Sequence, residues 1–200
     1  MKRKELDYFH IGRSLGGNQD WFKDPWMKMG GCAAECACDS CIYLTCRKGM
    51  EHLYPYDGGH LNKADYIRFS TIMKPYLKPR FSGIDKLPIF TEGFQNYLQD
   101  AGAKPIAMKT VAGTADAEEC EQAVQEQIDR DLPVQMLLLN LKDKTYEDYE
   151  WHWFTLGGYD RQDGKFLVKA ITYGKGEWLD FQGLWTARAD QRGGLVLYEI

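Results

Sequence analysis

The spacing of hydrophobic positions changes character near the middle of the chain. In the second half, residues 132–139 are apolar on both faces, which predicts a central strand. Runs rich in β-branched and aromatic residues, separated by turns that contain glycine, predict further strands. These strands cover residues 151–156, 165–173 and 194–200, with turns at 157–164 and 174–176 and a polar loop at 142–150. The second half is therefore expected to form an antiparallel meander.

Helical spacing dominates the first half. Residues 32–48 are small and apolar, and two basic residues precede Gly49, which is typical of a buried helix that ends at a glycine. Further helices are predicted at 62–76, 91–98 and 116–130, and a strand at 104–111. The opening thirty residues are rich in aromatic residues and glycine and show no sustained period, so they predict a long ordered loop.

Helices in the first half and strands in the second predict an α+β fold in which the two kinds of element are segregated. The length of 200 residues lies at the upper end for one domain, so a single domain over residues 1–200 is expected. No internal repeat and no low-complexity segment interrupts the sequence.

Composition and charge exclude several classes of protein. With 44% hydrophobic residues and a net charge of -4, the chain is neither disordered nor as basic as a typical nucleic-acid-binding protein. It contains no run of about 18 apolar residues, the length that a membrane-spanning helix needs, and its first residues lead into no signal-peptide stretch. We therefore expect a soluble, cytoplasmic protein that binds neither nucleic acid nor a membrane.

The six cysteines are concentrated in one segment. Five lie between Cys32 and Cys46, and Cys120 stands alone. A disulfide framework would spread its pairs through a shorter, secreted chain, so reduced thiols are expected. The local crowding then indicates catalytic chemistry, metal ligation or the packing of small buried side chains.

Helical geometry argues against one metal site in this segment. The spacing of Cys38 and Cys41 is that of a C-x-x-C motif, which favours metal or redox chemistry. At about 100° per residue, however, Cys36 and Cys46 fall within roughly 40° of Cys32, whereas Cys38 and Cys41 lie near the opposite face. A continuous helix therefore makes these cysteines packing residues, and no metal or cofactor is expected. A broken helix would restore the possibility of a metal site.

Cys32 has the position of a nucleophile in the predicted helix. Unpaired backbone N–H groups and the positive end of the helix dipole favour a thiolate in the first turn and can also stabilise an oxyanion. Gly30 and Gly31 precede it and leave the sulfur uncovered. Among the four histidines, only His152 lies in a predicted core strand, between Trp151 and Trp153, which makes it the candidate general base and acid.

The order of these segments resembles a known signature. Gln19, then Gly31 to Ala34 at the start of a helix, then residues 132–134 on a strand and residues 152–160 resemble the papain-like cysteine peptidase superfamily. Within it the chain is most similar to bacterial peptidases that process bacteriocins at a double-glycine leader. The resemblance implies a papain-like fold, with a helical N-terminal half packed on a twisted antiparallel sheet, and a peptide or amide substrate.

The same resemblance implies a role for three residues. Cys32 would be the nucleophile, His152 its base and later the proton donor to the leaving group, and Gln19 the side-chain donor of the oxyanion hole. Gln19 precedes Cys32 by thirteen positions (32 minus 19), about twice the usual spacing, so residues 21–30 would form an inserted loop. Asn18 is the alternative donor.

The residue that should orient the imidazole also departs from the pattern. A hairpin that turns about residue 162 would pair His152 with a residue near Thr172, where the sequence has neither Asp nor Asn. Thr172 could accept a hydrogen bond from the ring, or Asp180 could reach in from the next segment. Both alternatives stay open.

Three hypotheses about function follow. The leading one is hydrolysis of a peptide or amide bond by Cys32 and His152, and acyl transfer to another amine begins with the same acyl-enzyme. The second is a papain-like binding module that has lost catalysis, because the expected orienting residue is missing. The third is a cysteine-rich metal or redox protein. The residues predict no oligomeric state.

Overall fold

The computed structural model describes residues 2–103, 106–190 and 192–200. A seven-stranded antiparallel sheet forms its centre, with the strand order β4-β9-β5-β6-β7-β8. Strand β1 pairs with the C-terminal half of β6. The strands are β1 (Lys2–Glu5), β4 (Ala107–Ala112), β5 (Val134–Leu138), β6 (His152–Gln162), β7 (Lys165–Thr172), β8 (Lys175–Asp180) and β9 (Gly194–Glu199). The predicted antiparallel sheet in the second half is confirmed.

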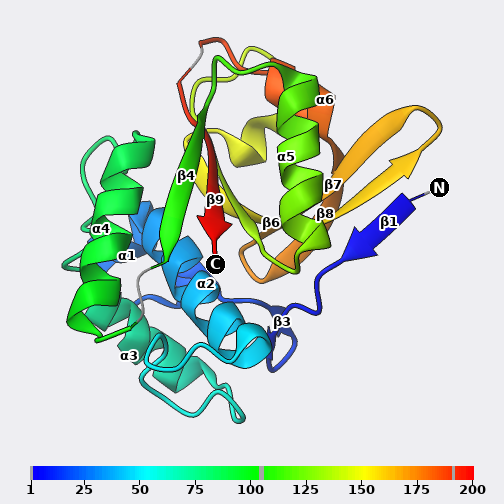
Figure 1. Ribbon diagram of the computed structural model, residues 1–200. Helices are drawn as coiled ribbons and strands as arrows, with labels where there is room; N and C mark the ends of the chain where they lie inside the picture. The colour runs from blue at the N-terminus through cyan, green and yellow to red at the C-terminus, as the bar shows by residue number, and fades with distance from the viewer. Residues whose placement is uncertain (1, 104–105, 191) are drawn as a thin grey trace.

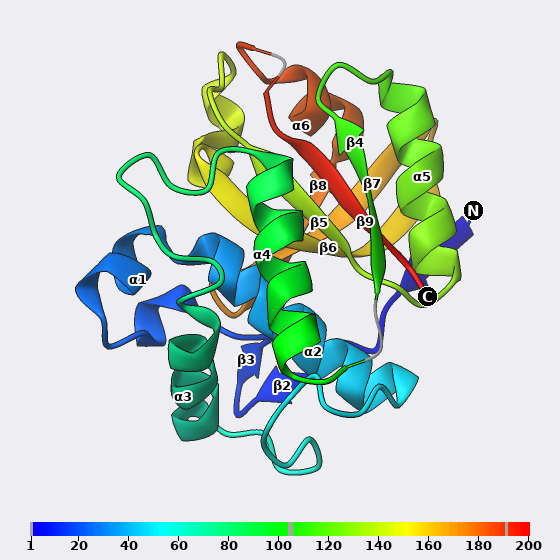
Figure 2. The ribbon, with the colours of Figure 1, turned by 60° about the vertical axis from the view of Figure 1, so that its left-hand side comes forward.

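Helices from the first half cover one side of this sheet. Figures 1 and 2 show α1 to α4 gathered on one side, whereas α5 lies on the other side near α6. The helices are α1 (Pro25–Gly30), α2 (Cys32–Lys48), α3 (Lys63–Met73), α4 (Leu87–Asp100), α5 (Ala117–Asp129) and α6 (Phe181–Thr186). The α+β fold, with a helical N-terminal half packed on a twisted antiparallel sheet, is confirmed.

Helix α2 is the central helix, and its composition explains its position. Every residue from Cys32 to Leu44 is buried, and the small alanine and cysteine side chains let the helix pack closely against β6. The helix is continuous and ends at Gly49, whose φ of 62° is readily adopted by glycine and whose N–H bonds to the Leu44 carbonyl. Both the length of this helix and its glycine stop are as predicted.

The opening thirty residues differ from the predicted loop. They contain β1, a short hairpin of β2 (His10–Ile11) and β3 (Ser14–Leu15), the 3-10 turn η1 (Gln19–Trp21) and α1. These elements are too short to show a hydrophobic period. Helix α1 did carry a local signal, because Asp24 caps it by accepting a hydrogen bond from the Met27 N–H at 3.0 Å, and Pro25 occupies its first turn.

The predicted turn at 157–164 is also wrong. Strand β6 runs on to Gln162, and only Asp163 and Gly164, both with positive φ, form the turn to β7. The pairing register of β6 and β7 shifts between Leu156 and Tyr159. At the two glycines in that bulge, a side chain at 157 would meet the end of the Ile171 side chain, and one at 158 would crowd the backbone of β1. Close approach of neighbouring strands, and not a turn, explains them.

The other predicted elements are present with shifted ends. Helix α4 begins at Leu87, before the predicted start, because Pro88 fits its first turn. The predicted strand at 104–111 corresponds to β4, and residues 104–105 lie outside the described residues. A 3-10 segment, η2 (Lys144–Tyr149), occupies the predicted polar loop.

Among the described residues, no helix combines the length and the apolar character needed to cross a membrane.

Candidate active site

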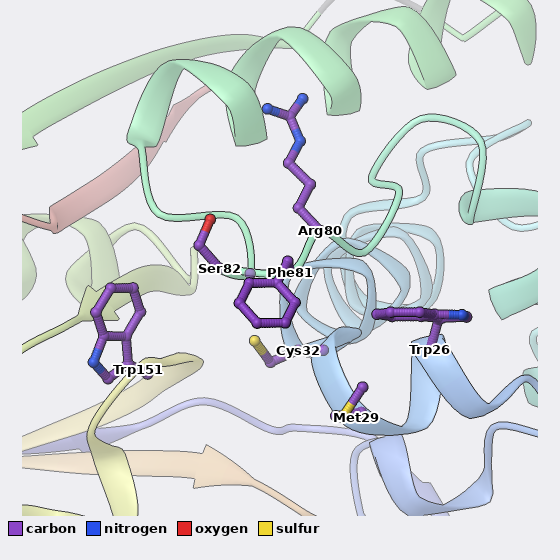
Figure 3. A pocket seen from close by; sticks show the side chains of 9 residues that line it. Trp26, Met29, Cys32, Arg80, Phe81, Ser82 and Trp151 are labelled. Atoms are coloured by element: carbon purple, nitrogen blue, oxygen red, sulfur yellow. The ribbon is translucent and has the colours of Figure 1, made fainter.

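Cys32 is the first residue of α2 and faces a pocket. Gly31, the residue before it, has no space for a side chain, because the Met27 carbonyl and the Phe22 ring lie against it. This close packing lets α2 follow α1 directly. The Cys32 side chain is only 7% exposed, and Figure 3 shows its sulfur directed into the pocket beneath Phe81. The predicted position of Cys32 at the helix start is confirmed.

The surroundings of the sulfur favour the thiol over the thiolate. Burial raises the pKa of Cys32 to about 11, and the nearby Glu35 acts in the same direction. The backbone N–H groups of Trp153, Ala33 and Cys32 itself lie close to the sulfur and oppose this shift. Desolvation outweighs these N–H groups, so Cys32 is protonated at neutral pH.

His152 is the first residue of β6 and is held on two sides. Its Nε2 lies 2.7 Å from Oγ1 of Thr172, and its ring stacks on Tyr173 with 5.0 Å between ring centroids and 4° between planes. No described residue hydrogen-bonds its Nδ1. Burial lowers the pKa of His152 to about 4, so the imidazole is neutral at pH 7 and able to accept a proton.

Cys32 and His152 lie on elements that meet, and no hydrogen bond joins their side chains among the described residues. The backbone N–H near the Cys32 sulfur belongs to Trp153, the residue after His152. Tyr173, which stacks on the His152 ring, is also near the sulfur: burial and then the charge of Cys32 raise the pKa of its hydroxyl to about 12. The start of α2, the start of β6 and the turn after β7 therefore meet at one point.

Thr172 occupies the position expected of the orienting residue. The sequence left Thr172 and Asp180 as alternatives, and the strand register separates them. Asp180 pairs with Leu167 at the far end of β7, whereas Thr172 ends β7 beside His152. Of the two alternatives, the geometry therefore favours Thr172, which meets His152 with a neutral hydroxyl.

A second contact holds the turn that follows Thr172. Nδ2 of Asn18 donates to the Tyr173 carbonyl at 3.0 Å, and the N–H of Leu15 donates to the Gly174 carbonyl at 2.9 Å. Tyr173 and Gly174 both have positive φ, the backbone shape of a tight hairpin turn. Asn18 thus fixes the turn that carries Tyr173 against His152, a role that the sequence did not indicate.

Gln19 lies near the site but is engaged elsewhere. Its side chain is buried, and Nε2 donates to the Lys28 carbonyl at 2.9 Å. Its Oε1 has no hydrogen-bond partner among the described residues. The structure thus links the amide of Gln19 to α1, and its role at an oxyanion remains a prediction.

Two buried carboxyl groups lie below Cys32 on α2, and the sequence analysis missed both. Burial raises the pKa of Glu35 well above its ordinary range and that of Asp39 to about 7. Asp39 accepts hydrogen bonds from the Tyr66 hydroxyl at 2.8 Å and the Gly17 N–H at 3.1 Å. Acidic residues one turn apart in an otherwise small, apolar helix were the available signal.

The other cysteines do not join Cys32 in one site. Cys36, Cys38 and Cys41 are buried along the continuous helix α2, and all six cysteines have free thiols. The described residues include no group of three or more His, Cys, Asp or Glu side chains placed to hold a metal ion. A break in this helix would have been needed to turn the cysteines toward one metal ion, and α2 is unbroken.

The pocket over Cys32 has a volume of about 440 Å³. Large apolar side chains line it, from α1, from the loop before α4 and from the start of β6 (Figure 3): Trp26, Met29, Phe81 and Trp151. A second pocket, of about 670 Å³, is lined by Thr172, Tyr173, Tyr149, Asp148 and Glu177 among others. Hollows therefore adjoin both Cys32 and Thr172, the hydroxyl partner of His152.

Neither a family profile nor a curated protein matches the sequence. Among solved structures, the Pseudomonas avirulence protein AvrPphB is similar over 84% of this chain and 89% of that chain, with 14% sequence identity and a TM-score of 0.36. A likeness at this level carries no argument about function. The functional conclusion rests on the arrangement of Cys32, His152 and Thr172.

Proposed function

We propose that the protein is a cysteine hydrolase that cleaves a peptide or amide bond with Cys32 and His152. One observation carries this proposal: the Cys32 sulfur is at the N-terminus of a buried helix and at the floor of a pocket, and the strand that begins at His152 meets the helix there. Thr172 holds His152 through Nε2, so we assign the transfer of the thiol proton to Nδ1. A nucleophile, a base and an orienting residue are the parts that such a reaction needs.

The pKa values define the order of proton movements. The pKa of Cys32 is raised to about 11 and that of His152 is lowered to about 4, so the pair rests as a neutral thiol and imidazole. The sulfur forms its bond to the substrate carbonyl carbon while Nδ1 of His152 takes the thiol proton. Backbone N–H groups at the start of α2 face the developing oxyanion.

The second half of the reaction returns the site to its starting state. The imidazolium gives its proton to the leaving amine as the carbon–nitrogen bond breaks. Water then attacks the thioester, with His152 as base, and releases the acid and the free thiol. Transfer of the acyl group to another amine would use the same thioester and differs only in the attacking group.

The narrower parts of this proposal have their own support. The chain order of Gln19, Cys32 and His152 supports a papain-like fold and superfamily, and the similarity of residues 152–160 supports a bacterial leader-peptidase type. The resemblance implies a turn at residues 158–160, after the histidine, but these residues belong to strand β6 and form no turn, which weakens the narrower assignment. Free thiols support a reducing compartment such as the cytoplasm. One hydrophobic cluster with residues of both halves supports a single domain over residues 1–200.

The test is hydrolysis of an unbiased peptide mixture, followed by mass spectrometry, for wild type and Cys32→Ala. We expect cleavage by the wild type and a loss of roughly 10⁴-fold or more in Cys32→Ala. Cys36→Ala is a matched control, because Cys36 is buried one turn further along the same helix. Cleavage that Cys32→Ala leaves undiminished would refute the proposal.

A binding module is the second candidate, and the burial of Cys32 favours it. A thiol that is 7% exposed and has a raised pKa reacts slowly. This candidate predicts that wild type and Cys32→Ala bind the same peptides with equal affinity and that neither cleaves them.

A further inference from the structure

Exposed apolar side chains gather around Cys32. Seven large hydrophobic residues are exposed in the part of the chain that the structure describes, and four of them line the Cys32 pocket. Trp26 is 53% exposed, Met29 72%, Phe81 99% and Trp151 44%. Apolar side chains grouped in this way at a pocket mark a binding site for an apolar ligand group.

The walls of this pocket are fixed by contacts outside it. Asp24, which caps α1, forms an ion pair with Lys74 beyond the end of α3. The Trp153 indole N–H donates to the Ile84 carbonyl at 2.7 Å and so ties the loop after Phe81 to β6. These contacts hold the backbone on two sides of the pocket, which lowers the entropy lost on binding, whereas the Phe81 side chain is 99% exposed and is not itself held.

Arg80 gives the pocket its charge. It is the one charged residue among those that line the pocket, and its side chain is exposed. Within the described part of the chain, Arg80 forms no ion pair. Figure 3 shows its side chain extending from the rim of the pocket, away from Cys32, so its guanidinium is available to a carboxylate beside the apolar part of the pocket.

We infer that this pocket selects a peptide segment in which an aromatic or long aliphatic side chain stands next to an acidic residue. This inference rests on the proposed function. The apolar side chain fits among Trp26, Phe81 and Trp151, and the carboxylate lies against Arg80. The peptide backbone then passes over the Cys32 sulfur at the pocket floor.

The experiment measures binding separately from cleavage. Three labelled peptides of equal length contain Glu-Phe, Glu-Ser or Lys-Phe at the centre, and their affinities for Cys32→Ala are measured by fluorescence polarisation. We expect the Glu-Phe peptide to bind roughly tenfold or more tightly than the Glu-Ser peptide. Its advantage over the Lys-Phe peptide should be about fivefold at low salt and smaller at high salt.

Paired variants of the Cys32→Ala protein locate the preference. Phe81→Ala should reduce the advantage of Glu-Phe over Glu-Ser, whereas Ile72→Ala should not, because Ile72 is 40% exposed on α3 and outside this pocket. Arg80→Gln should remove the advantage over Lys-Phe, and Lys78→Gln should retain it. Equal binding of the three peptides, or an equal effect of the control substitutions, would overturn the inference.

The same peptides separate this inference from the proposed function. Selective binding without cleavage by the wild type would leave the pocket assignment intact and remove the hydrolase proposal. Cleavage of all three peptides at equal kcat/KM would do the reverse.

Discussion

Two stretches of helix α2 bury ionisable groups in different ways. At its first residue, Cys32 faces a pocket, and strand β6, which begins at His152, meets the helix there. Two turns further on, Asp39 is equally buried, but its oxygens are occupied by Tyr66 and Gly17. Burial keeps both side chains in or near their neutral form. Access to a pocket and a proposed proton partner distinguish Cys32, the candidate reactive group, from Asp39, the structural one. A shifted pKa does not distinguish them, because burial shifts both.

The largest expected effect follows from removing the base. His152→Ala should lower kcat/KM of peptide cleavage by roughly 10³-fold, because general base catalysis contributes about 10² to 10⁴. His60→Ala is a control, because His60 is 89% exposed and pairs only with Asp57 among the described residues. Equal activity of His152→Ala and wild type would show that Cys32, like Asp39, has only a structural role.

A smaller effect is expected at the orienting hydroxyl. Thr172→Val keeps the shape of the side chain but removes the hydrogen bond to Nε2 of His152, so kcat should fall by roughly tenfold with little change in KM. Thr172→Ser should keep most of the activity. Because the Thr172 hydroxyl contacts Nε2, Thr172→Val should also change the imidazole nitrogen shifts in NMR spectra, whereas unchanged shifts would show that the hydroxyl does not fix the tautomer.

The pH dependence of alkylation distinguishes a neutral pair from an ion pair. Because the pKa of Cys32 is raised to about 11, its reaction with iodoacetamide should be slow at pH 5 to 6 and should still rise above pH 9. Mass spectrometry of the modified peptide measures the rate at each pH. A fast reaction that is already constant at pH 5 to 6 would show a thiolate at rest and contradict the neutral pair.

The smallest effect concerns stability at Asp39. Its pKa is raised from 3.8 to about 7 in the folded protein, so the folded state binds the proton more tightly than the unfolded state. The stabilisation from this proton is complete below about pH 4 and is lost as the pH rises to about 7. Asp39→Asn cannot titrate and should flatten the free energy of unfolding over this range, as measured with urea. If the free energy of unfolding of Asp39→Asn depended on pH as in the wild type, Asp39 would be excluded as the source of that dependence.

The sequence predicted the long elements of the fold and missed the short ones. Helix α2 and the apolar strand β5 extend over enough residues to show their period and burial. Strands β2 and β3, of two residues each, show no period. The glycines at 157 and 158 were interpreted as a turn because their close contacts with β1 and β7 depend on partners distant in the sequence.

The candidate site divides in the same way. Cys32 and His152 could be found because each lies at the start of a long element with a distinctive local composition. Thr172 could be named only as one alternative to Asp180, because the expected position holds neither Asp nor Asn and only the strand register separates the two residues. The roles of Asn18 and Phe81 depend on loop geometry, which no spacing pattern encodes.

The most direct test of the Cys32–His152 pair is acylation of the protein by p-nitrophenyl acetate at pH 7, followed by mass spectrometry. We predict one acetyl group per chain, on Cys32. It should form much more slowly in His152→Ala, whereas Cys36→Ala should be acetylated on Cys32 at the wild-type rate. Acetylation spread over several residues, or a rate on Cys32 that His152→Ala leaves unchanged, would contradict the account.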